Sequence, residues 1–114
     1  KSKLRKINQL KKNGVTLLFA KSDNKGRLKL KSVIKELSKM QITSVLVEGG
    51  SKIYSSFINQ NLFDDIYLFV SPKILGGGLK SFSEISSKKI SDATKLFIKS
   101  SQKIGDDVLL ELVK

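Results

Sequence analysis

The amino-acid sequence predicts a single α/β domain, with a mixed, mainly parallel sheet and an antiparallel hairpin at the C-terminal end. Apolar segments at 15–20, 44–47 and 66–70 have the length of strands, and amphipathic helical segments separate them. Strand–helix–strand units of this spacing are typical of right-handed crossovers in a parallel sheet. The tail differs, because two strand-like segments flank Gly105-Asp106-Asp107, a sequence typical of a hairpin turn.

The first third of the chain predicts a helix, a strand and a second helix. Apolar residues recur at helical spacing over 4–10, and the pair Asn13-Gly14 is typical of a helix end. The segment that follows is continuously apolar, which indicates a strand buried on both faces, as in a parallel sheet. A turn cluster at 22–26 precedes an apolar stripe over 30–40, which predicts the second helix.

The rest of the chain predicts four further elements after the strand at 44–47. They are a helix over 51–60, the strand at 66–70, and hairpin strands at 95–104 and 108–113. A loop that contains proline and three glycines connects the third strand to the hairpin. No internal repeat and no low-complexity linker interrupts this order.

The composition limits the chemistry. The 114 residues are 39% hydrophobic, enough for one ordinary domain. No segment approaches the roughly 20 apolar residues of a membrane span, so we expect a cytoplasmic protein without a membrane partner. The chain has no His and no Cys, which excludes Ser-His triads, Cys nucleophiles and zinc sites within it. Carboxylates, lysines, hydroxyls, backbone amides or a bound cofactor must provide any chemistry, and we expect no metal.

The net charge of +12 raises the alternative of a nucleic-acid-binding module. Only Arg5 and Arg27 are arginines, whereas surfaces that read bases rely on arginine. The lysines are scattered over every segment, which indicates a bias of the whole sequence more than one binding face. We therefore expect no nucleic-acid partner, and a mild attraction for phosphorylated small molecules.

The strongest candidate site is the junction between the strand at 44–47 and the helix over 51–60. Glu48 ends the strand, and Gly49-Gly50 leads directly into the helix. Glycines let a backbone approach a ligand closely, and the free N–H groups and dipole of a helix N-terminus favour an anion. The same pattern is also typical of a tight strand-to-helix connection. It is neither a G-x-G-x-x-G fingerprint nor a P-loop.

Three other motifs each allow two interpretations. The glycines at 76–78 form either a mobile loop over a cofactor or a flexible crossover, and the sequence favours neither. The pair Asp64-Asp65 has no partner acid or His, so a turn and helix cap is favoured over a paired acid site. Tyr54 and Phe57 share one helix and are more typical of a core than of ligand stacking.

Two stretches match a known family in order, spacing and residue type. They are LVEGGS at 46–51 and LFDDIYLFVSPKILGGG at 62–78, with the helix containing Phe57 between them. They resemble the pyrimidine reductases of riboflavin biosynthesis, which share the dihydrofolate-reductase-like fold. The similarity is weaker but consistent over 15–40 and over the final hairpin. The resemblance implies a three-layer αβα arrangement with a mixed, mainly parallel sheet and a C-terminal antiparallel hairpin.

This resemblance implies an NADPH-dependent reduction of the ribosyl group of 5-amino-6-(5-phosphoribosylamino)uracil to a ribityl chain. Carried over by position, the residues that would contact the NADPH diphosphate are Gly49, Gly50, Ser51 and Lys52. Glu48 would face the sugar hydroxyls of the substrate. Backbone amides suit phosphate and an ionised carboxylate suits hydroxyl donors, which supports this division. The alternative role of Glu48 is to hold a neighbouring helix N-terminus.

The resemblance has further implications for the loops. Gly76 and Gly77 would belong to a loop over the cofactor. The run GGSKIY at 49–54 is similar to the double-glycine signature of dihydrofolate reductases, which implies an unusual, cis, peptide bond between Gly49 and Gly50. No residue is assigned a catalytic role, because the cofactor carries the hydride and needs no protein base.

Residues 1–114 resemble only the C-terminal portion of such a reductase domain. The family's first strand and helix, its substrate loop and its adenosine-binding segment have no counterpart, and neither has the zinc deaminase domain fused to many bacterial reductases. We expect a partial domain that is inactive alone and that belongs to a homodimer or higher homo-oligomer. The alternatives are a dihydrofolate or pteridine-type reductase and a non-catalytic domain that docks on nucleic acid or a partner chain.

Overall fold

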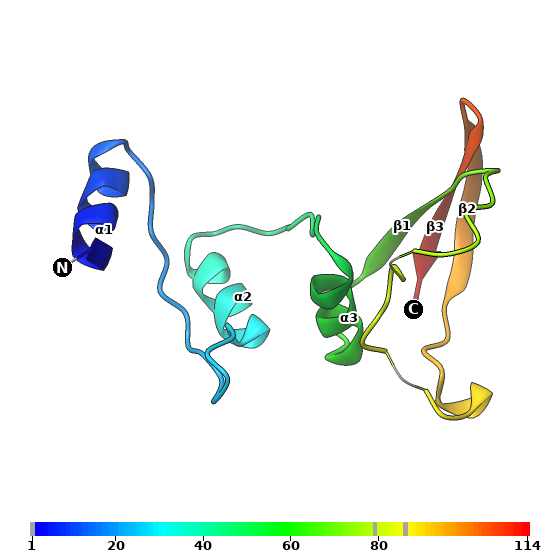
Figure 1. Cartoon of the computed structure of the whole chain (residues 1–114), viewed down its shortest axis with the longest axis horizontal. Coiled ribbons are helices and arrows are strands. Elements are labelled where there is room, and N and C mark those ends of the chain that lie inside the picture. Colours follow the sequence, from blue (N-terminus) through cyan, green and yellow to red (C-terminus); the bar gives the residue numbers. More distant parts are fainter. Residues whose placement is uncertain (1, 79, 86) are drawn as a thin grey trace. The chain divides into compact units, whose positions relative to one another are not determined.

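The computed structural model describes residues 2–78, 80–85 and 87–114 (Figure 1). It divides into two units, Lys1–Leu46 and Val47–Lys114. The first unit contains the helices α1 (Ser2–Lys12) and α2 (Leu30–Lys39). The second contains the helix α3 (Ser51–Asn59), the strands β1 (Asp65–Val70), β2 (Phe97–Ile104) and β3 (Asp107–Val113), and the short 3₁₀ helix η1 (Ile90–Asp92).

The α-helices of the described chain end with the same backbone motif. The residue after each C-cap has a positive φ: 75° at Gly14, 61° at Gln41 and 54° at Asn61. After α1, the Gly14 N–H donates to the Lys11 carbonyl and the next N–H donates to the Leu10 carbonyl, each at 3.0 Å. This is a Schellman motif, and equivalent hydrogen bonds close α2 and α3. The helices predicted in these three places are confirmed.

The strands predicted at 15–20 and 44–47 are not formed in the described chain, which is a correction to the expected mainly parallel sheet. A strand needs a neighbouring strand for its backbone N–H and C=O groups. The described ladders pair neither segment with one. Their side chains are exposed as well, with Phe19 at 72% and Leu46 at 75%. Continuous apolarity indicates that a segment can be buried, but it does not name the strand that pairs with it.

The sheet that the structure describes has three strands in the order β1-β3-β2, and both pairings are antiparallel (Figure 1). The last strand of the chain is therefore the central one. Its hairpin with β2 turns at Gly105-Asp106, between the paired residues Ile104 and Asp107. Gly105 has a φ of 60°, as the first position of a two-residue hairpin loop requires. The predicted hairpin and the strand predicted at 66–70 are confirmed.

The two faces of this sheet differ in what covers them. On one face, Ile66 and Leu68 of β1 lie with Ile58 of α3 around a cavity of about 380 Å³, which Phe82 and Leu96 also line. Side chains alternate along a strand, so Tyr67 and Phe69 belong to the opposite face, where they are 56% and 58% exposed. Among the described residues no apolar side chain is fully buried. The packing that positions α3 is therefore on the first face.

Candidate functional site

The junction predicted from the double glycine opens α3 with free backbone donors. Gly50 is the N-cap, with φ −73° and ψ 168°, and no side chain caps the helix. Its carbonyl accepts the N–H groups of Ile53 and Tyr54 at 3.0 and 3.3 Å. In the described part of the chain, the N–H groups of Gly50, Ser51 and Lys52 donate to no protein acceptor. Such donors, at the positive end of a helix dipole, favour a phosphate group.

Gly49 is held from the side by a residue of the helix itself. Its N–H donates to the hydroxyl of Tyr54 at 3.0 Å, and a Cβ atom at Gly49 would lie 3.2 Å from the Ile53 side chain. No peptide bond of the described chain is cis. The expected cis bond between Gly49 and Gly50 is therefore wrong. A cis bond without proline costs about 2.5–4 kcal/mol, and the trans junction already gives the Gly49 N–H a partner.

Gly50 leaves room in front of the backbone. Its φ of −73° suits any residue, so the conformation itself does not require glycine there. A Cβ atom at Gly50 would meet no atom within 4 Å. The space that a side chain would fill is thus open beside free amides, which fits the close approach of a diphosphate.

The other predicted residues of the junction are contiguous with these glycines. Glu48 is exposed, and within the described residues its carboxylate makes no ion pair. No side chain caps α3, so Glu48 does not hold the N-terminus of that helix. Lys52 is exposed in the first turn. The residues 48–52 therefore form one corner that offers a carboxylate, amides, a hydroxyl and an ammonium group.

The glycine loop predicted to cover a cofactor has a conformation that requires glycine. Gly76 has a φ of 69° and Gly78 a φ of 131°, values that L-residues rarely adopt. Gly77 lies between them and has no such constraint. Over the described residues, no backbone hydrogen bond joins this loop to 48–52. The role of Gly76 and Gly77 over a cofactor stays a prediction.

Sequence reasoning missed the contacts that side chains of α3 make with Ser83 and Glu84. Ser55 is completely buried, and its Oγ accepts the N–H of Glu84 at 3.2 Å. Ser51 Oγ lies 2.9 Å from Ser83 Oγ. Polar residues at four-residue spacing on an otherwise amphipathic helix were the available signal, but such residues are usually solvent-facing.

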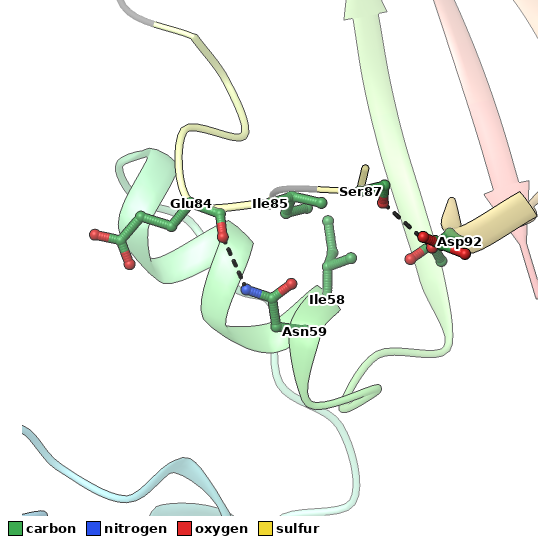
Figure 2. A pocket seen from close by; sticks show the side chains of 7 residues that line it. Ile58, Asn59, Glu84, Ile85, Ser87 and Asp92 are labelled. Atoms are coloured by element: carbon green, nitrogen blue, oxygen red, sulfur yellow. Dashed lines mark hydrogen bonds between the residues drawn. The ribbon is translucent and has the colours of Figure 1, made fainter. Parts of the chain in front are cut away.

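A second cavity, of about 330 Å³, lies at the C-terminal end of α3 (Figure 2). Its polar groups bind one another: Asn59 Nδ2 donates to the Glu84 carbonyl at 3.1 Å, and the Ser87 hydroxyl donates to the Asp92 carbonyl at 3.2 Å. Among the described residues, no cluster of His, Cys, Asp or Glu is able to hold a metal ion. This cavity offers less to a ligand than the junction does.

The groups with shifted pKa values lie outside the junction. The hydrogen bond from Lys99, at 2.6 Å, is the main cause that lowers the pKa of Glu111, and the same bond raises the pKa of Lys99. The hydroxyl of Ser100 assists at 3.0 Å. In the first unit, the backbone N–H of Arg27 is the main cause that lowers the pKa of Asp23. These groups stabilise the hairpin and a turn.

No helix in the described chain is long and apolar enough to cross a bilayer.

Known proteins match this chain over most of its length. Residues 1–110 match the RibD C-terminal domain. The riboflavin biosynthesis protein RibD of Aquifex aeolicus is 33% identical over 105 residues, which cover 92% of this chain and 28% of that protein. The protein of the same name from Actinobacillus pleuropneumoniae is 35% identical over 112 residues, which cover 96% of this chain and 30% of that protein.

A third relative is named for a single activity. The 5-amino-6-(5-phosphoribosylamino)uracil reductase of Buchnera aphidicola subsp. Acyrthosiphon pisum is 33% identical over 98 residues, which cover 85% of this chain and 47% of that protein. This chain therefore spans from 28% to 47% of the length of these relatives.

Solved structures share the fold. RibD of Acinetobacter baumannii, form 1, matches with a TM-score of 0.80 at 24% identity, over 93% of this chain and 28% of that one. A diaminohydroxyphosphoribosylaminopyrimidine deaminase/5-amino-6-(5-phosphoribosylamino)uracil reductase of Thermotoga maritima matches with a TM-score of 0.66 at 34% identity, over 74% of this chain and 23% of that one. These matches confirm the predicted α/β fold of the dihydrofolate-reductase-like class. The resemblance on which that prediction rested is confirmed too: this chain belongs to the RibD C-terminal domain family.

Proposed function

We propose that this chain forms part of the NADPH site and the substrate site of a reductase acting on 5-amino-6-(5-phosphoribosylamino)uracil. The observation that carries the proposal is the first turn of α3, where free amides stand beside the open space at Gly50. Membership of the family and the name of the Buchnera relative support the same chemistry. Because the chain spans less than half of its relatives, we assign the activity to a full-length protein that contains it. We expect the 114 residues alone to be inactive.

The residues of the junction would have different roles in binding the cofactor. The Gly49 N–H is used by Tyr54, so the diphosphate would receive hydrogen bonds from the amides of Gly50, Ser51 and Lys52. Gly49 contributes its small size instead. The Lys52 ammonium group adds a positive charge in the first turn, where it strengthens the attraction of the helix dipole for an anion.

Glu48 would bind the substrate on the other side of the double glycine in the sequence. Its carboxylate accepts hydrogen bonds only, so sugar hydroxyls are suitable donors. NADPH, when bound, supplies the hydride. In the open-chain imine of the substrate, the sugar carbon would take that hydride and the nitrogen would take a proton from water. The protein therefore has to position the two molecules and needs no base of its own.

The test is the reaction of the full-length protein with NADPH and the aminouracil ribosylamine phosphate. We expect NADPH oxidation, followed by absorbance, to match the formation of the ribityl product, followed by mass spectrometry. NADH and dihydrofolate are the comparison arms, and each should react much more slowly. Rapid turnover of dihydrofolate in place of the aminouracil would show that the substrate is wrong, and failure to bind NADPH would show that the cofactor is wrong.

Three accompanying properties belong to the same proposal. The enzyme would act in the cytoplasm, as a homodimer or a higher homo-oligomer, and without a nucleic-acid partner. Sedimentation of the full-length protein tests the subunit number. Titration with duplex and single-stranded DNA at low and high salt tests the last property, because a nucleic-acid site would give salt-dependent binding.

A further inference from the structure

Three polar side chains form a stripe along one face of α3. Ser51, Ser55 and Asn59 are four residues apart, a spacing that places side chains on the same face of a helix. Each of them hydrogen-bonds to the two-residue segment Ser83-Glu84. All of these residues belong to the unit Val47–Lys114. The stripe therefore ties α3 to a segment that lies 32 residues from Ser51 in the sequence.

The stripe satisfies both main-chain groups of Glu84. The Glu84 N–H donates to Ser55 Oγ at 3.2 Å. The Glu84 carbonyl accepts from Asn59 Nδ2 at 3.1 Å, as Figure 2 shows. Ser55 is 0% exposed, so water does not replace its hydroxyl at this position. Glu84 itself is exposed, and the hydrogen bond of its N–H to the buried Ser55 is half-buried. These two hydrogen bonds fix the backbone at Glu84, and with it the position of the preceding residue.

The preceding residue is Ser83, whose hydroxyl lies 2.9 Å from the hydroxyl of Ser51. Ser51 is the first residue of α3, and its backbone N–H is one of the three free N–H groups at the junction. The contact with Ser83 holds the side chain of Ser51, the residue whose amide is assigned to the diphosphate. Fixing a binding residue before the ligand arrives lowers the entropy cost of binding.

We propose that Ser83 is a positioning residue for the first turn of α3, and that Ser55 and Asn59 hold Ser83 in place through Glu84. Ser83 touches neither substrate nor cofactor in this scheme and acts through Ser51. The proposal rests on the proposed function for the identity of the ligand, which is the diphosphate of NADPH. The hydrogen bonds to Glu84 stand independently of that ligand.

The first experiment measures cofactor kinetics in the full-length protein. Ser83→Ala removes the partner of Ser51 and should raise the KM for NADPH about fivefold, the factor that corresponds to about 1 kcal/mol, with kcat unchanged. Ser83→Thr keeps the hydroxyl and should restore the KM. Ser81→Ala is the matched control, because Ser81 is an exposed serine of the same segment. An unchanged KM in Ser83→Ala, or an equal rise in Ser81→Ala, overturns the positioning role.

The second experiment measures hydrogen exchange at the Glu84 amide in the same protein without ligand. Ser55→Ala removes the acceptor and should speed exchange of that amide about tenfold. Ser56→Ala is the control, because the Ser56 hydroxyl donates to the Lys52 carbonyl within α3. Equal exchange rates in wild type and Ser55→Ala overturn the fixing of Glu84.

The two experiments separate this inference from the proposed function. If the wild-type protein does not bind NADPH, the proposed function fails, and the exchange rate of Glu84 still decides whether Ser55 fixes the segment. If the wild-type protein reduces the aminouracil with NADPH and Ser83→Ala behaves identically, the proposed function stands and the positioning role is overturned.

Discussion

The hydroxyl of Tyr54 accepts a hydrogen bond from the N–H of Gly49 at 3.0 Å, which joins the first turn of α3 to the peptide that leads into it. The bond uses the amide of the first glycine and leaves that of the second one free. Sequence reasoning favoured a core position for Tyr54. In the structure Tyr54 is half-buried, and its hydroxyl also binds the backbone between Glu48 and the helix.

Tyr54→Phe should loosen this junction without unfolding the protein. The ring remains and only the acceptor is lost, so the NADPH dissociation constant should rise about three- to fivefold, as expected for one hydrogen bond. Titration of the full-length variant with NADPH measures the change. Tyr67→Phe is the control, because the Tyr67 hydroxyl is 3.5 Å from Glu111 in the sheet, a long contact. Equal NADPH affinity in wild type and Tyr54→Phe would contradict a role for the hydroxyl.

Gly50→Val should separate cofactor binding from folding. A Cβ at this position meets no protein atom within 4 Å and φ is −73°, so the fold should tolerate valine. The branched side chain would fill the space assigned to the diphosphate, and NADPH affinity should fall at least tenfold, about 1.4 kcal/mol. Gly50→Ala should give a smaller loss. A folded Gly50→Val protein, verified by circular dichroism, that binds NADPH like wild type would show that the diphosphate lies elsewhere.

Gln41→Gly should stabilise the protein. Gln41 has a φ of 61° at the end of α2, where its N–H and the next one bond to the carbonyls of Ser38 and Leu37. Glycine adopts this conformation without the steric cost that an L-residue bears, so the free energy of unfolding should rise by about 0.5–1 kcal/mol. Urea denaturation of the full-length protein measures it. Asn61→Gly should give a smaller gain, because asparagine tolerates the left-handed region better; a gain at Asn61 larger than at Gln41 would refute this account.

The Lys99–Glu111 pair predicts a loss of hairpin stability at both extremes of pH. The pKa of Glu111 is lowered from 4.5. Its contribution to the free energy of unfolding is therefore complete above pH 4.5 and is lost as the pH falls through the lowered pKa. The pKa of Lys99 is raised from 10.5, so its contribution is complete below that pH and is lost as the pH rises through the raised pKa. Glu111→Gln should flatten the acid side of the stability profile, measured by denaturation. An unchanged acid side would contradict the pairing.

The local features of this fold were predictable from the sequence, because short-range chemistry determines them. Asn13-Gly14 marks the end of α1, and Gly105 marks the turn of the hairpin, because both glycines adopt a positive φ. The double glycine likewise marks the start of α3. Each of these signals lies within a few residues of the structure that it determines.

The pairing of strands was not predictable in the same way. β3 lies between β1 and β2, and it pairs with β1 residues that are 38 to 48 positions earlier, such as Leu68 with Leu110. Apolar patterning marks which residues suit a strand, but not which strand receives their hydrogen bonds. Ser55 shows the same limit for the site, because a serine on a helix gives no sign of being buried until the segment that it binds is known.

Glu48→Gln distinguishes substrate binding from a structural role. Glu48 is exposed and does not cap α3, so the substitution should leave the melting temperature and NADPH affinity unchanged. If the carboxylate binds sugar hydroxyls, each charge-assisted hydrogen bond is worth about 1.5–3 kcal/mol, and the KM for the aminouracil substrate should rise at least tenfold. Both parameters are measured on the full-length protein. A helix cap would produce the opposite pattern, a loss of about 1 kcal/mol of stability with unaltered substrate kinetics, and that result would refute the assignment of Glu48 to the substrate.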